Sequence, residues 1–196
     1  MTRNSTTTSD RPLVDAIDAP PSSSHDLADA CSYSENGLER YSNRLLQSRV
    51  GRDQQRYDGN TRLLVCIAVV SRRARHVGTD TDECLLISSS KHPTQWILPK
   101  GGWETDESVV ESALREANEE AGVAGHIDNS LGTLDFVSQQ GKPCRFYGFK
   151  LQVTEIFDDW AENTRLRKWV SFAEARELLQ HRPELLEMMS RAAATT

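Results

Sequence analysis

The sequence lacks the long apolar runs and paired cysteine motifs that mark several classes of protein. No run of apolar residues is long enough to cross a membrane, and none near the start suits a secretory signal peptide. The four cysteines, Cys31, Cys66, Cys84 and Cys144, are widely spaced without a CxxC pair, which argues against a structural zinc site. We therefore expect a protein without a membrane segment, located in the cytoplasm or also in the nucleus.

Large apolar residues are scarce in the first part of the chain, and over the whole chain the 29 acidic residues outnumber the 23 Lys and Arg residues. Residues 1–45 are rich in Ser, Thr, Asp and Pro, which predicts a largely disordered tail. The net charge of −6 argues against stable binding of nucleic acid, although a local basic patch is compatible with it. The 196 residues suit one folded domain over residues 46–192 and a frayed end at 193–196, and we expect a monomer.

What the sequence does contain is a distinctive acidic stretch, GGWETDESVVESALREANEEAGV, from Gly101 to Val123. The pattern predicts an amphipathic helix that begins near Thr105 or Asp106 and ends at Gly122. At about 100° per residue, Glu116 and Glu120 form one row, with Glu119 to one side. Like charges at this spacing destabilise a helix, and a hard divalent cation would offset the repulsion. The alternative is an ordinary solvated acidic face.

The apolar pattern around this stretch predicts an α/β protein. Leu63–Val70 is a continuous apolar run typical of a buried strand, in which Cys66 is a core thiol, as is Cys84 in the next strand. Further strands are expected at Cys84–Ile87, Leu131–Val137, Cys144–Val153 and Arg167–Val170, with a polar loop at Ser71–Asp82. Helices are expected at Gly37–Arg49, at Phe172–Gln180 behind a Ser171–Glu174 capping box, and from Pro183 to about Ala192.

Every fixed position of the Nudix box is filled in this stretch, so the sequence resembles the Nudix hydrolases. The residues at these positions are Gly101, Glu107, Arg115, Glu116, Glu119, Glu120 and Gly122. The resemblance implies a Nudix α/β/α sandwich with a mixed central β-sheet. It also implies that Glu116 and Glu120 bind Mg²⁺ or Mn²⁺ together with a main-chain carbonyl of Lys100 or Gly101. Glu119 is then the expected general base, with a further metal ligand as its alternative role, while Arg115 orients the carboxylates and Glu107 braces the loop.

The resemblance extends over about Arg52 to Met189. Within this range the sequence is similar to the diphosphoinositol polyphosphate phosphohydrolases, which also cleave diadenosine polyphosphates. The similar segments are LLISSSKHPTQWILPKGGWETDES, the later DW followed by Arg165, the RKW segment and HRPELLE. This implies a small-molecule polyphosphate substrate, held by basic and hydroxyl side chains. The implied substrate-binding residues are Ser89, Ser90, Lys91, Lys142, Arg145, Arg165 and Arg182, with Arg52, Arg56 and Arg62 as N-terminal candidates of which Arg52 and Arg62 are preferred.

Two other functions remain open from the sequence. Hydrolysis of dinucleoside polyphosphates or of capped RNA would favour an aromatic side chain that stacks on a base. Trp103 and Trp160 are candidates for stacking, and each is equally suited to packing. A phosphate-sensing module without catalysis is the third interpretation, against which the complete set of box glutamates argues.

Overall fold

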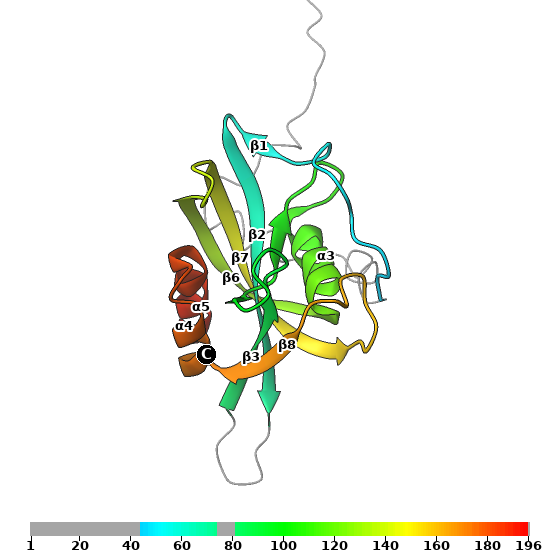
Figure 1. Cartoon of the computed structure of the whole chain (residues 1–196), viewed down its shortest axis with the longest axis vertical. Helices are drawn as coiled ribbons and strands as arrows, with labels where there is room; N and C mark the ends of the chain where they lie inside the picture. The colour runs from blue at the N-terminus through cyan, green and yellow to red at the C-terminus, as the bar shows by residue number, and fades with distance from the viewer. Residues whose placement is uncertain (1–43, 74–80, 196) are drawn as a thin grey trace, which may run out of the picture.

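The computed structural model describes residues 44–73 and 81–195, and shows a mixed β-sheet between helices (Figure 1). The strands and helices occupy the ranges β1 Tyr57–Asp58, β2 Thr61–Arg73, β3 Thr81–Ser88, β4 Trp96–Ile97, β5 Lys100–Gly102, α3 Val109–Ala121, β6 Val123–Val137, β7 Pro143–Ile156, β8 Arg167–Ser171, α4 Phe172–Leu178 and α5 Pro183–Ala194.

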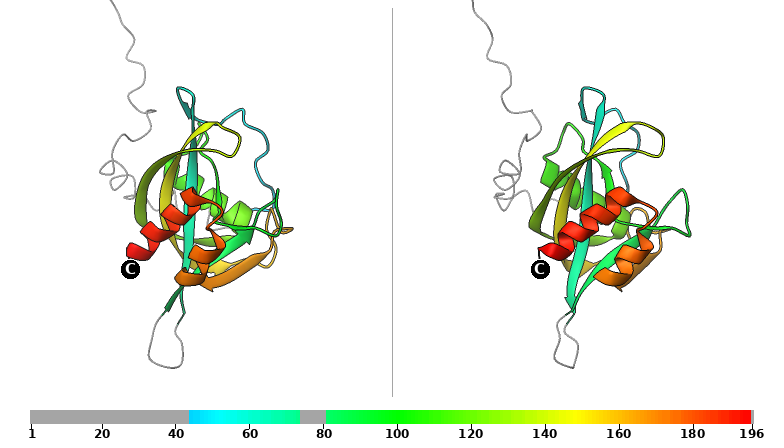
Figure 2. Two further views of the ribbon diagram at one scale, coloured as in Figure 1. Left: turned by 60° about the vertical axis from the view of Figure 1, so that its left-hand side comes forward. Right: turned by 90° about the vertical axis from the view of Figure 1, so that its left-hand side faces the viewer.

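The sheet runs in the order β4-β3-β2-β7-β6, with β1 and β5 paired to β2 and β8 paired to β3. Strands β2 and β7 are parallel, whereas the other pairs are antiparallel, so the sheet is mixed. Helix α3 packs on one face, and α4 and α5 lie on the other, as the turned views make clear (Figure 2). This arrangement confirms the predicted α/β/α sandwich.

Strand β2 lies in the middle of the sheet and explains the apolar run seen in the sequence. Every residue of Leu63–Val70 is buried, because helices cover both faces of the sheet. Cys66 and Cys84 are fully buried in this core, as predicted for structural thiols. The neighbouring strand β3 contributes Leu85, and most of the buried apolar residues form one contiguous core.

Helix α3 begins later than the sequence analysis predicted. Neither Thr105 nor Asp106 caps it, because Ser108 occupies the N-cap position. The Ser108 hydroxyl accepts from the Glu111 N–H, while the Glu111 carboxylate accepts from the Ser108 N–H in a complete capping box. The other end is as predicted, since Gly122 has φ 61° and donates its N–H to the Asn118 carbonyl.

Several other boundaries differ from the expected ones. The expected loop at Ser71–Asp82 is shorter, because β2 continues to Arg73 and β3 begins at Thr81. Strand β6 begins at Val123 rather than Leu131, and three irregularities in its pairing with β7 interrupt the alternation that would have revealed it. Helix α4 ends two residues early and α5 extends to Ala194.

The N-terminal expectations fall mostly outside the described chain. The helix expected at Gly37–Arg49 is absent from its described part, because residues 44–50 are not helical. The rest of that expected helix lies outside the described residues, as do residues 1–43 of the predicted tail. Within the described part of the chain, no helix is both long and apolar enough to span a membrane.

Candidate active site

Helix α3 buries the acidic face that the sequence pattern predicted. The side chains of Glu116, Glu119 and Glu120 are 10%, 5% and 8% exposed, so a solvated acidic face does not describe them. The neighbouring face of the helix, with Ala113 and Ala117, packs into the core. Burial of three adjacent carboxylates is costly unless cations compensate for their charge.

Arg115 supplies much of that compensation. Its guanidinium donates to both oxygens of Glu107, at 2.8 and 2.7 Å. It also donates to Glu116 Oε1 at 2.8 Å and to Glu119 Oε2 at 3.3 Å. A further bond to the Gly102 carbonyl ties the helix to β5. Arg115 therefore links the box loop, β5 and the acidic face in one buried network.

Glu120 has a separate set of partners. Its Oε2 accepts from the Lys100 backbone N–H at 2.8 Å, and its Oε1 accepts from Arg165 Nη2 at 2.6 Å. Arg165 is buried and also donates to Glu162 Oε2 and to the Ser88 carbonyl. Arg165, predicted to contact substrate, thus lies against Glu120 in this structure.

The carboxyl groups retain protons more readily than exposed glutamates do. Burial raises the pKa of Glu119 to about 7, although Arg115 and Arg49 oppose that rise. Burial and the neighbouring Glu120 raise the pKa of Glu116, and burial raises the pKa of Glu120 as well. The protein's own cations therefore leave part of the cost of ionising these carboxyl groups uncompensated.

The donor chemistry fits a hard divalent cation, but the side chains do not converge. Within residues 44–73 and 81–195, no three His, Cys, Asp or Glu side chains are arranged to hold a metal ion. The box glutamates instead bond to Arg115, to Arg165 and to the Lys100 N–H. Glu116 and Glu120 nevertheless offer carboxylate oxygens one helical turn apart, which is the donor type that Mg²⁺ and Mn²⁺ prefer.

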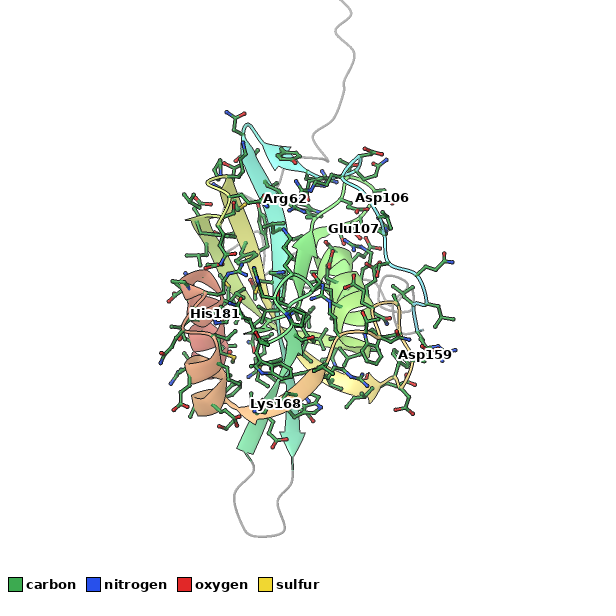
Figure 3. The ribbon with its side chains drawn as sticks, viewed as in Figure 1. Arg62, Asp106, Glu107, Asp159, Lys168 and His181 are labelled. Atoms are coloured by element: carbon green, nitrogen blue, oxygen red, sulfur yellow. The ribbon has the colours of Figure 1, made fainter. Side chains whose placement is uncertain are left out.

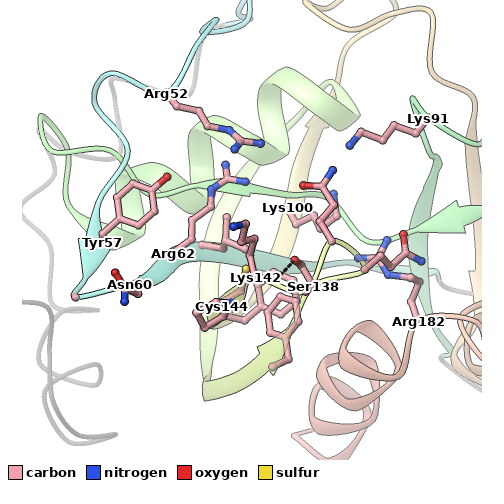
Figure 4. A pocket seen from close by; sticks show the side chains of 18 residues that line it. Arg52, Tyr57, Asn60, Arg62, Lys91, Lys100, Ser138, Lys142, Cys144 and Arg182 are labelled. Atoms are coloured by element: carbon pink, nitrogen blue, oxygen red, sulfur yellow. Dashed lines mark hydrogen bonds between the residues drawn. The ribbon is translucent and has the colours of Figure 1, made fainter.

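A cleft of about 830 Å³ beside β5 gathers basic side chains from distant parts of the chain (Figure 4). Among the described residues that line it, none is acidic. We call it the cation cleft, and its basic lining residues are Arg52, Arg62, Lys91, Lys100, Lys142 and Arg182. Five of them were predicted to bind substrate, and Lys100 connects the cleft to Glu120 through its backbone N–H.

The electrostatics of the cation cleft favour an anionic ligand. Burial and the nearby Arg52 charge lower the pKa of the Arg62 guanidinium, which shows that the cations are crowded. Arg62 also bonds through Nε to Gln55 Oε1 at 2.6 Å, which fixes its orientation. Arg182 is partly neutralised by Glu184 at 2.7 Å. Phosphate groups in the cleft would relieve the repulsion among the remaining cations.

The structure does not bring every predicted binding residue into the cation cleft. Arg145 pairs with Asp135 and Asp58 on the surface. Ser89 accepts a hydrogen bond from the His92 N–H, and Ser90 is exposed on the same turn as Lys91. Along the described chain, the residues that line the cleft include neither these two serines nor Arg145.

Arg56 and the two candidate tryptophans are structural in their contacts. Arg56 lies over the Trp103 ring and donates to the carbonyls of Glu104 and Thr105. These two residues belong to the loop before α3, which continues with Asp106 and Glu107 (Figure 3). Trp103 is 5% exposed and Trp160 is 7% exposed, so neither offers a face for stacking a base. The structure therefore favours packing for both tryptophans.

Sequence reasoning missed the aromatic residues Tyr57, Phe136 and Phe146 that line the cleft, and of these three Tyr57 is the exposed one. Tyr57 lines the cation cleft and is 51% exposed, a position from which its ring is open to a ligand. The signal was its place in QRYDGNT, a polar segment with Gly59 that makes a turn between β1 and β2.

Comparison with known proteins agrees with this geometry. A family model described as "NUDIX domain" matches residues 67–192. "Nudix hydrolase 21, chloroplastic" of Arabidopsis thaliana is 44% identical over 140 residues, covering 69% of each protein. "Diphosphoinositol polyphosphate phosphohydrolase NUDT4B" of Homo sapiens is 41% identical over 114 residues, covering 56% of this chain and 62% of that protein.

The fold agrees as well. The crystal structure of a C. elegans Ap4A hydrolase binary complex superposes with a TM-score of 0.55 at 22% identity, covering 68% of this chain and 96% of that one. Nudix hydrolases generally use divalent metal ions, which the buried carboxylates of α3 are chemically suited to bind. On the family match, the relatives and the fold together, this chain belongs to the Nudix hydrolases.

Proposed function

We propose that this protein removes the β-phosphate of diphosphoinositol polyphosphates in a reaction that depends on Mg²⁺ or Mn²⁺. The observation that carries the proposal is the cation cleft, in which six basic side chains surround a volume of about 830 Å³ without an acidic lining residue in the described chain. An inositol ring bearing several phosphates concentrates more negative charge than a single nucleotide does, and such a ligand needs basic groups on several sides.

The relatives support this substrate class without deciding it. The human relative named as a diphosphoinositol polyphosphate phosphohydrolase is 41% identical over the aligned part. Other relatives are plant proteins named only as Nudix hydrolases, such as the chloroplastic one from Arabidopsis thaliana. The substrate is therefore inferred mainly from the charge and size of the cation cleft.

Each part of the site has a role in the proposed reaction. Glu116 and Glu120, with the carbonyl of Lys100 or Gly101, would hold the cation, which when bound neutralises phosphate charge and lowers the pKa of bound water. Glu119, with a pKa raised to about 7, accepts the proton of the attacking water on a carboxylate oxygen. The new bond forms between the water oxygen and the β-phosphorus. The bond between the β-phosphorus and the bridging oxygen breaks, the bridging oxygen stays on the inositol polyphosphate, and the β-phosphate leaves as inorganic phosphate.

The basic residues orient the substrate for this attack. Arg62 and Lys100 lie on the strands next to the box, and Lys91, Lys142 and Arg182 come from other segments of the cleft wall (Figure 4). Holding the non-reacting phosphates on these side chains fixes the diphosphate group relative to Glu119. Arg165, held by Glu120 and Glu162, would have to turn away from Glu120 to reach a phosphate.

A second candidate substrate is a dinucleoside polyphosphate, and one observation favours it. The exposed ring of Tyr57 stands on the wall of the cation cleft, where it could stack on a base while the phosphates contact the cations. The same argument applies to capped RNA.

A direct comparison of substrates tests the proposal. Purified protein with Mg²⁺ is given a diphosphoinositol pentakisphosphate, diadenosine hexaphosphate or capped RNA, and the initial rates are measured. We expect kcat/KM on the diphosphoinositol to exceed the others by about tenfold or more. Glu120→Gln, which keeps the side-chain shape, should abolish turnover and shows that the activity is the protein's own. A faster reaction on the dinucleotide or the cap would refute the proposed substrate, and tight inositol-phosphate binding without phosphate release would indicate a sensor.

A further inference from the structure

Residues 44–50 lie before the part of the chain that matches the family model, yet they contact the acidic helix (Figure 1). We call this segment the strap. The Leu45 N–H donates to the side-chain oxygen of Asn118 at 2.9 Å, and Asn118 is fully buried between Ala117 and Glu119. The strap is therefore fixed to α3 at the turn that carries the predicted general base.

Arg49 of the strap is bonded to the loop that leads into α3. Its Nη1 donates to Glu104 and, at 2.7 Å, to Asp106 Oδ1. It also lies 4.0 Å from Glu107 Oε2, the carboxylate that Arg115 holds from the other side. Arg49 thus neutralises the acidic loop from outside while Arg115 does so from inside.

Ser48 connects the strap to Glu120 through two other residues. Its hydroxyl donates to Glu162 Oε1 at 3.1 Å, and Glu162 Oε2 accepts from Arg165 Nε at 2.6 Å. Arg165 Nη2 then donates to Glu120 Oε1 at 2.6 Å. The Glu162 N–H is also bonded to the Glu119 carbonyl, which holds this chain of contacts against the helix.

We propose that the strap is a positioning element of the active site, in which Arg49 holds the box loop and Ser48 fixes Glu120 through Glu162 and Arg165. Neither residue lines the cation cleft, so the strap acts on the carboxylates and not on substrate binding. The proposal requires that the acidic face of α3 bind the divalent cation, and it is independent of which phosphoanhydride is cleaved.

Arg49→Ala in the full chain tests the proposal with two readouts. Mn²⁺ binding to the free protein is followed by electron paramagnetic resonance, and kcat and KM are measured on a diphosphoinositol pentakisphosphate. Loss of a residue that supports metal ligands costs about 10-fold or more in metal affinity or activity. We expect weaker Mn²⁺ binding and a kcat lower by about 10-fold, with KM changed less than about twofold. Arg49→Lys, which keeps the charge at this position, should restore most of both. The Mn²⁺ readout needs no substrate, so it remains valid if the proposed substrate is wrong.

Arg44→Ala is the matched control, because Arg44 lies on the same strap and pairs only loosely, at 3.9 Å, with the exposed Asp159. It should leave Mn²⁺ binding and kcat unchanged. Ser48→Ala should lower both by about threefold, and it decides the matter should Arg49→Ala not fold. Unchanged or tighter Mn²⁺ binding in both Arg49→Ala and Ser48→Ala would overturn the proposal, as would an equal loss in Arg44→Ala.

Discussion

At Gly101 the backbone lies directly against a carboxylate. A Cβ atom built at this position would stand 2.0 Å from the Glu116 carboxyl carbon and Oε1 and 2.1 Å from Oε2, closer than real Cβ contacts come. The space that a side chain would need is therefore the space of the predicted metal ligand. This explains in steric terms why the box begins with glycine at a residue whose backbone φ makes no special demand.

Gly101→Ala should consequently impair catalysis more than folding. Glu116 must move away from the new methyl group, which displaces a metal ligand, and activity should fall about 10- to 100-fold with weaker Mn²⁺ binding. The melting temperature should change little, because a flexible side-chain end can move aside. Gly51→Ala is the control, since Gly51 does not line the cleft and its Cβ meets nothing within 4 Å although its φ is +102°. Wild-type activity in Gly101→Ala would contradict this account.

The core thiols lead to a pH-dependent prediction. Burial raises the pKa of the Cys84 thiol to about 12, whereas an unfolded cysteine titrates near about 8.5. Between these pH values the unfolded chain releases the proton and the folded chain keeps it. Stability should therefore fall as the pH rises through this window. Measured with a thiol reagent at pH 9, Cys84 should react only after denaturant is added, and fast labelling of the native protein would show the site to be accessible.

Side-chain environments were the least predictable part of the site. The box spacing identified Glu116, Glu119 and Glu120 correctly as one helical cluster, but their burial depends on Arg165 and the strap, which approach from distant parts of the chain. Tyr57 is similar, since its polar segment indicates a turn but does not show that the ring will line a cleft. Tertiary contacts decide such features, and the sequence pattern contains only the local spacing.

Local interactions fix both ends of helix α3, but only its C-terminal end could be predicted correctly from the sequence. The C-terminal Gly122 was predicted because only glycine adopts φ 61° easily. The N-terminus was misplaced because Thr105, Asp106 and Ser108 are all good caps, and the reciprocal partner Glu111 decides among them. Strand β6 was only half predicted, since its pairing irregularities hide the period of two.

Gly122→Ala should destabilise the protein by about 2–3 kcal/mol. The alanine would have to adopt the left-handed backbone conformation, and its Cβ would stand 2.7 Å from the Trp160 ring. Gly141→Ala is the matched comparison, because its φ is +73° and nothing lies within 4 Å of its Cβ. At Gly141 the substitution therefore loses only the free energy needed to hold alanine in the left-handed conformation, about 1 kcal/mol. Urea unfolding of both variants separates the two contributions, and equal losses would show that contact with Trp160 has no cost.

At the scale of the whole molecule, charge is separated between the surface and one cleft. The chain carries a net charge of −6, yet the cation cleft brings together six basic residues that are spread along the sequence between Arg52 and Arg182. The α/β/α fold was predictable because the apolar run of β2 and the Nudix box are each an unbroken stretch of sequence. The cleft was predictable only in part, and by resemblance, because no local pattern shows which surface cations will converge.

This separation predicts a substrate affinity that depends on salt. Raising NaCl from about 50 to about 200 mM shortens the range of the attraction between the cleft and a polyanion, so KM should rise several-fold while kcat changes little. Lys142→Ala should raise KM at low salt and reduce this salt dependence, because one cation of the cleft is lost. Lys168→Ala removes a surface lysine paired with Glu174 away from the cleft, and it should leave both quantities unchanged. A KM independent of salt in the wild-type protein would mean that cations of the cleft do not attract the substrate, and the proposed polyphosphate would lose its main support.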